Sequence, residues 1–69
     1  MNEWLGMMNE WIKNNQLLSV HYLRIKKGPS SFSGRLLQMN DDYLLFYGDD
    51  MKEVINLHIH QIDHIEPFE

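Results

Sequence analysis

The stretch that decides the fold is residues 32–47, FSGRLLQMNDDYLLFY. Two apolar runs flank a short polar segment, and Gly34 comes early in the first run. Residues 32–39 alternate loosely and residues 43–47 are almost continuously apolar and aromatic, a composition typical of strands. Asn40, followed by two aspartates, supplies turn chemistry, because Asn and Asp side chains bond to their own backbone. The stretch therefore predicts a tight antiparallel hairpin at the centre of a small β domain.

Ahead of this hairpin, apolar residues at helical spacing predict a short amphipathic helix over residues 3–13. One face of it carries Trp4, Met8, Trp11 and Ile12. A helix this short is marginal alone in water, so we expect it to pack against the sheet. We interpret the two tryptophans as core residues, and a docking stripe for a partner protein is the alternative.

Five short strands are predicted, because β-branched and aromatic residues recur between turn signals. They cover residues 17–26, 32–39, 43–47, 53–60 and 63–68. A loop is expected over residues 28–31, where proline follows glycine, and a one-turn corner near residues 60–62, where the apolar alternation changes parity. The predicted fold class is mainly β: an N-terminal helix followed by a five-stranded, strongly bent antiparallel sheet, with residues 1–69 as one domain.

Composition limits both the stability and the partners of this chain. With 69 residues it is close to the lower size at which one core holds a fold, and without cysteine it has no disulfide to add. Self-association is the remaining common source of stability. The net charge of −4 argues against sequence-independent nucleic-acid binding, which depends on a basic surface. No apolar run reaches the length of a membrane span, so we expect a cytoplasmic protein with no membrane partner.

Three stretches carry a family resemblance: residues 19–23 (SVHYL), Gly34-x-Leu36 followed by Asn40, and residues 60–67 (HQIDHIEP). In order and spacing they resemble the first strand, the first Sm motif and the closing segment of the Sm-like family of small barrels. The bacterial RNA chaperone branch of that family, Hfq, is the most similar in shape. The family usually has Asp where this chain has Asn40.

The resemblance implies ring assembly, because Sm-like barrels pair the fourth strand of one subunit with the fifth strand of the next. An apolar strand left at a sheet edge invites such pairing, and cyclic closure satisfies both edges. The residues expected at this interface are Val54, Ile55, Leu57, Ile59 and Ile65.

The family's RNA pocket is only partly matched by this sequence. The hairpin positions that would bind a base read Tyr43 and Leu44, no Arg-Gly occurs near the fourth strand, and only His60 matches the Hfq pocket. Asp41 and Asp42 add negative charge that opposes a phosphate. The remaining RNA candidates are Tyr22, Arg24, Lys26, Lys27 and His60. A solvated strand end is the alternative interpretation of the three cations.

The histidines offer a weak metal candidate. His58 and His60 are predicted to point the same way on a strand, with His64 four residues later, and imidazole is a common ligand of Zn²⁺ and Ni²⁺. The predicted corner separates His64 from the other two, so a solvated or interface role is favoured, and no metal or cofactor is expected. The serines lack a paired base and no phosphate-cradling glycine loop occurs, so we expect no enzyme activity.

Two functions of different classes follow from the sequence. The first is a non-catalytic, ring-forming Sm-like module that binds RNA through divergent contacts. The second is a protein-interaction or structural module without RNA binding, which docks partners on the tryptophan helix or on the acidic turns at residues 41–42 and 49–50.

Overall fold

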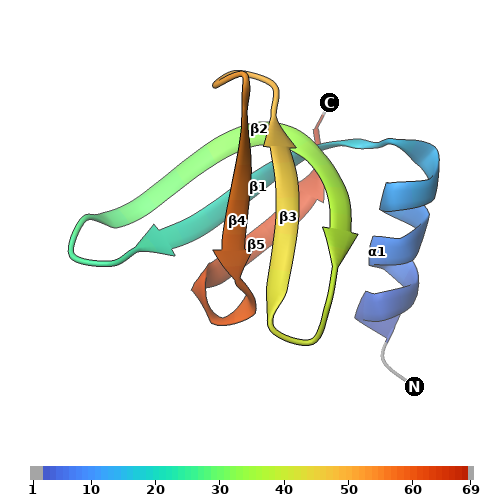
Figure 1. The fold of residues 1–69 in the computed structure, drawn as a ribbon, viewed down its shortest axis with the longest axis horizontal. Helices are drawn as coiled ribbons and strands as arrows, with labels where there is room; N and C mark the ends of the chain where they lie inside the picture. The colour runs from blue at the N-terminus through green and yellow to red at the C-terminus, as the bar shows by residue number, and fades with distance from the viewer. Residues whose placement is uncertain (1–2, 69) are drawn as a thin grey trace.

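The computed structural model describes residues 3–68, which form one helix followed by five strands (Figure 1). The helix α1 covers Glu3–Asn14, and a 3-10 helix, η1, covers Ile59–Gln61 between the last two strands. The strands are β1 (Leu17–Arg24), β2 (Gly28–Met39), β3 (Tyr43–Gly48), β4 (Glu53–His58) and β5 (Ile62–Pro67). They form one antiparallel sheet in the order β4-β3-β2-β1-β5. The predicted fold class, a helix followed by a five-stranded antiparallel sheet, is confirmed.

The hairpin predicted from residues 32–47 is formed by β2 and β3 at the centre of the sheet. The Asn40 side chain closes its turn, because its Oδ1 accepts hydrogen bonds from the backbone N–H groups of Asp42 at 2.8 Å and Tyr43 at 2.7 Å. The backbone N–H of Asn40 also donates to the carbonyl of Tyr43 at 3.0 Å. The Asx-turn chemistry expected from the sequence is therefore present.

Gly34 is required by the close approach of β3 to β2. Gly34 lies opposite Gly48 in the ladder, and a Cβ atom at position 34 would lie 2.2 Å from the carbonyl oxygen of Tyr47. That carbonyl belongs to the backbone of a central strand, so it cannot move away as a flexible side chain would. Along its length β2 bends strongly across the molecule (Figure 1).

The core lies between one face of the sheet and α1, which packs against β2. Among the described residues, the buried hydrophobic side chains are those of Met8, Trp11, Leu18, Val20, Phe32, Leu36, Leu44, Phe46, Leu57 and Ile65. The prediction that the tryptophan face is core is confirmed for Trp11, and Trp4 and Ile12 pack against the same cluster. In the alternative interpretation, a docking stripe for a partner protein, Trp11 could not take part, because its side chain is buried. No helix within residues 3–68 is long and apolar enough to cross a membrane.

The first hairpin extends beyond the rest of the sheet. β1 pairs with β5 only as far as Tyr22, but with β2 as far as Arg24. The two strands and their turn, residues 22–30, therefore project from the body of the protein, on the side away from α1 (Figure 1). We call residues 22–30 the arm.

The loop predicted over residues 28–31 is wrong, because these residues belong to β2. Pro29 lies opposite Leu23, and the alternation of the ladder makes this a non-hydrogen-bonded pair, so the missing N–H of proline leaves no bond unmade. The first strand, predicted to reach residue 26, ends at Arg24. A turn follows there, in which Lys27 N–H donates to the Arg24 carbonyl at 3.0 Å and Lys26 has a φ of 65°.

The fourth strand, predicted to reach residue 60, ends at His58, because η1 follows. The two ends of η1 stabilise each other: His58 Nδ1 accepts from the His60 N–H at 3.1 Å, and Gln61 Oε1 accepts from the His58 N–H at 3.0 Å. Ile59, which the predicted strand over residues 53–60 included, therefore lies in η1 and outside the side-chain alternation of β4. The corner predicted near residues 60–62 is formed by η1.

Candidate functional site: two open edges and a basic arm

The sheet has two open edges, because β4 and β5 stand at its ends and each pairs with a strand on one side only. Just after β4, the Ile59 N–H donates to the Asp42 carbonyl at 2.8 Å. This bond determines which pairs of the β3–β4 ladder are hydrogen-bonded and which are not, because the two kinds alternate. The backbone groups of Val54 and Asn56 then point away from β3, toward the free side. The N–H of His58 points the same way but is bound by Gln61.

The free edge of β5 is defined in the same manner. The Phe68 N–H donates to the Leu17 carbonyl at 2.9 Å, so the neighbouring residue, Pro67, stands at a position whose N–H is not needed by β1. Ile65, two residues earlier, directs its own N–H and carbonyl to the free side. Proline at such a position is typical of an edge strand.

The residues predicted for an oligomer interface differ in how exposed their side chains are. Val54 is 58% exposed and lies on the open edge of β4. Leu57 and Ile65 have side chains in the core, so neither can contribute its side chain to a partner, although the backbone of Ile65 is free. Ile55 and Ile59 are half-buried. Val54 is therefore the predicted residue whose side chain a partner could cover.

Three of the predicted RNA contacts, Arg24, Lys26 and Lys27, lie together at the tip of the arm, and all three are exposed. The ion pairs within residues 3–68 are Arg35–Asp49 and His64–Glu66, so none of these cations is paired with a described carboxylate. The structure thus gathers half of the six Lys and Arg residues on one projecting hairpin.

The other two predicted RNA contacts are placed differently. Tyr22 is half-buried, with its ring edge-on to Phe32 at 5.7 Å between centroids, so it does not form an open stacking platform. His60 is exposed on η1 and stacks on His58 at 4.9 Å. η1 reaches the arm through Gln61, whose Nε2 donates to the Leu23 carbonyl at 3.1 Å.

The two acidic turns have different surroundings. In the β3–β4 turn, Asp49 pairs with Arg35, and a carboxylate oxygen of Asp50 accepts from the Ser33 N–H at 3.3 Å. In the β2–β3 turn, Asp41 and Asp42 are exposed, and within residues 3–68 their carboxylates make neither a hydrogen bond nor an ion pair. Of these two acidic turns, only the β2–β3 turn with Asp41 and Asp42 has carboxylates free to pair with a cation from another molecule.

The histidines form two separate groups. His58 and His60 stack on each other at the corner, while His64 faces His21 across the β1–β5 ladder at 6.0 Å and its Nε2 lies 3.2 Å from a carboxylate oxygen of Glu66. Among the described residues, no group of three or more His, Cys, Asp or Glu is placed to hold a metal ion. The fold thus keeps His58 and His60 together and places His64 in the other group.

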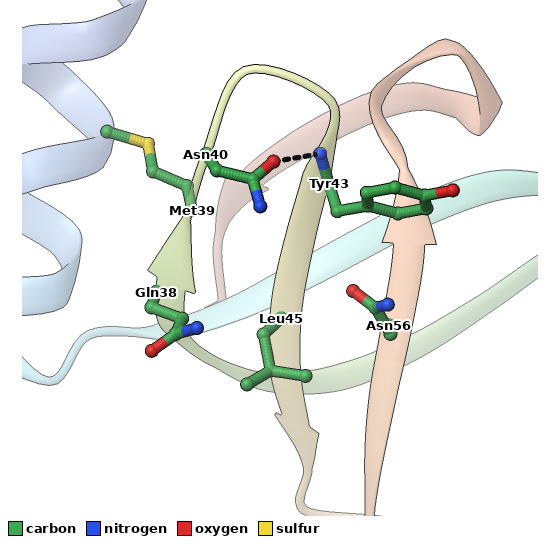
Figure 2. A pocket seen from close by; sticks show the side chains of 6 residues that line it. All are labelled: Gln38, Met39, Asn40, Tyr43, Leu45 and Asn56. Atoms are coloured by element: carbon green, nitrogen blue, oxygen red, sulfur yellow. Dashed lines mark hydrogen bonds between the residues drawn. The ribbon is translucent and has the colours of Figure 1, made fainter.

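A shallow hollow is lined by the β2–β3 turn and by residues of β2, β3 and β4 (Figure 2). Gln38, Leu45 and Asn56 form a row across β2, β3 and β4, and the Tyr43 ring stands at one end of it. The full lining is Gln38, Met39, Asn40, Tyr43, Leu45 and Asn56. These residues supply amides and one phenol, but no carboxylate, imidazole or amine for acid–base chemistry near neutral pH.

Sequence reasoning missed Gln61 and Arg35, which position the candidate surfaces. Gln61 joins η1 to the arm, and Arg35 joins the β3–β4 turn to the end of α1, because its Nε donates to the Asn15 carbonyl at 3.2 Å. The pattern His58-x-x-Gln61 has the spacing of a capping box, which was the available signal for Gln61. No local pattern identifies the partners of Arg35, since Asn15 and Asp49 are far from it in sequence.

No family model and no curated protein matches this chain. Among solved structures, it is similar to proteasome accessory factor B/C (PafBC) of Arthrobacter aurescens, with a TM-score of 0.76 and 14% sequence identity. The match covers 94% of this chain and 11% of that chain. At this identity the likeness is one of fold alone, and it shows that a similar unit occurs there as a small part of a longer protein.

Proposed function

We propose that this chain is a non-catalytic Sm-like module that assembles with copies of itself, the β4 edge of one copy pairing with the β5 edge of the next. Pairing of two different edges is head-to-tail, so it repeats from copy to copy and forms a ring where the rotation between copies closes. The observation that carries the proposal is the pair of open edges, with unpaired backbone groups at Val54, Asn56 and Ile65.

Two further features support self-pairing. Natural proteins protect edge strands with lysine, proline or a bulge, and β4, with the sequence EVINLH, has none of these. The strands β4 and β5 have the same length, six residues each. A chain of 69 residues also has a small core, so added burial between copies would stabilise it considerably.

The test removes one edge hydrogen-bond donor and leaves the rest of the sheet intact. Asn56→Pro deletes an N–H that points away from β3, and Asn56→Thr is the matched control that changes the side chain but keeps this N–H. We expect wild type and Asn56→Thr to be oligomeric in sedimentation velocity and Asn56→Pro to be a folded monomer by circular dichroism. A monomeric wild type, or an Asn56→Pro oligomer of unchanged affinity, would contradict the proposal.

RNA binding at the arm is a second proposal, which the three cations without an ion pair in the described part of the chain favour. It predicts that short U-rich or A-rich RNA binds at low salt, that affinity falls as salt rises, and that Lys26→Ala with Lys27→Ala weakens it. Fluorescence anisotropy with labelled RNA measures all three. Absence of binding at low salt would leave self-assembly as the function.

A further inference from the structure

We infer that the arm of one copy contacts the Asp41–Asp42 turn of the next copy, so that a charged contact adds to the pairing of the edges. This inference rests on the proposed assembly and names the surfaces that would meet beyond the strands themselves. It concerns a second copy of this chain as the partner of the arm.

The first argument is the separation of charge along the chain. Residues 11–40 contain five Lys and Arg and no Asp or Glu, whereas residues 41–69 contain eight of the ten acids and one lysine. The strands β1 and β2 and the turn between them thus hold four of the six Lys and Arg residues, and the chain from the β2–β3 turn onward holds most of the acids. Copies that meet head-to-tail would bring the basic part of one against the acidic part of the other.

The second argument is that only one acidic turn is available. Asp49 and Asp50 are already engaged with Arg35 and the Ser33 N–H, whereas the carboxylates of Asp41 and Asp42 are exposed and without a partner among residues 3–68. Asp63 lines the same shallow depression as Tyr22 and Leu23, at the base of the arm, and it forms no ion pair with the arm in the described residues. The three cations of the arm and the carboxylates of Asp41 and Asp42 therefore have no ion-pair partner among residues 3–68 of the same copy.

The third argument is topological. β5 begins at Ile62, beside Tyr22 and the base of the arm, and β4 ends at His58, beside Tyr43 and the Asp41–Asp42 turn. Antiparallel pairing places the start of β5 next to the end of β4 of the neighbouring copy. The arm and the neighbour's acidic turn then lie at the same end of the interface.

The arm also exposes apolar surface that a partner would cover. Ile25 is 79% exposed and Leu23 is 52% exposed, both next to the cations. The arm has no aromatic residue beyond the half-buried Tyr22 on which a base could stack, so its tip lacks the stacking surface that single-stranded RNA prefers. This composition favours a protein surface over RNA as the occupant.

Charge reversal and mixing test the inference. One variant carries Lys26→Glu and Lys27→Glu, and a second carries Asp41→Lys and Asp42→Lys. Each alone would place like charges at every contact, so we expect each to associate at least about tenfold more weakly than wild type at low salt. An equimolar mixture would again place opposite charges together, so it should recover wild-type association as alternating hetero-oligomers. Glu10→Lys and Lys52→Glu, at exposed positions outside both surfaces, are the control substitutions.

The outcomes separate this inference from the proposed function. Unchanged association of both reversed variants, with monomeric Asn56→Pro, would overturn the arm contact and leave the edge pairing standing. A monomeric wild type would overturn both. In a third outcome, the first variant loses RNA binding, the mixture does not restore it, and association is unchanged. That result would assign the arm to RNA instead. Sedimentation velocity at low and high salt, with circular dichroism for folding, distinguishes these results.

Discussion

The centre and the edges of the sheet obey different constraints. At the centre, β2 and β3 approach so closely that position 34 admits no side chain, and the Asn40 side chain closes the turn between them. At the edges, Val54 is exposed, and the backbone groups of Val54, Asn56 and Ile65 face no other strand. Contacts at the centre are complete within one copy, whereas those at the edges are not. Substitutions at the centre should therefore change unfolding, and substitutions at the edges should change association.

The largest effect on the free energy of unfolding is expected at Gly34. Replacement by alanine there and at Gly6 should change this free energy in opposite directions. Gly34→Ala places a Cβ against the Tyr47 carbonyl and should lower the free energy of unfolding by about 2–4 kcal/mol. Gly6→Ala, in α1 with open space around it, should raise it by about 0.5–1 kcal/mol. Urea unfolding measures both, at low protein concentration so that association adds nothing. Equal effects at the two positions would refute the close approach at Gly34.

A smaller effect is expected at Arg35, which connects the centre to the β3–β4 turn and to α1. Arg35→Ala should lower the free energy of unfolding by about 1 kcal/mol, because the pair with Asp49 is partly exposed and water weakens it. A double-mutant cycle with Asp49→Ala isolates the coupling between the two side chains. Zero coupling would mean that the ion pair contributes nothing in solution.

The smallest effect on unfolding is expected at the edge. Val54→Lys replaces an exposed side chain, so it should change the free energy of unfolding of the monomer by less than about 0.5 kcal/mol. Lysine is a residue that protects edge strands, so the same variant should associate much more weakly than wild type. Val54→Thr, which keeps the branched shape, is the control. A Val54→Lys variant that is unstable as a monomer would contradict the assignment of Val54 to an open edge.

Local chemistry made the centre predictable from sequence. The turn at Asn40 and the apolar runs on both sides depend on neighbouring residues, so the β2–β3 hairpin follows directly from residues 32–47. The same approach failed at Pro29. Whether proline is tolerated in β2 depends on whether a backbone N–H at position 29 would have to bond to β1. Ladder alternation decides that, and it is set by the register with a distant strand. The arm was missed for this reason.

The candidate surfaces were predictable only in part. Arg24, Lys26 and Lys27 are near neighbours in sequence, so their clustering could be expected, and it is observed. The difference between the two acidic turns could not be predicted, since Arg35 engages Asp49 across the sheet and nothing in the dipeptide Asp-Asp reports it. Leu57 and Ile65 were expected at an interface, but their side chains are needed in the core.

The most direct test of the central claim, that open edges drive assembly, is amide hydrogen exchange measured by NMR over a range of protein concentration. We predict that the N–H groups of Val54, Asn56 and Ile65 exchange rapidly at low concentration and become protected as the oligomer forms. The N–H groups of Ile55 and Leu57, which bond to β3, should be protected at every concentration. Edge amides that stay unprotected while the oligomer grows, or a protein that stays monomeric, would contradict the account.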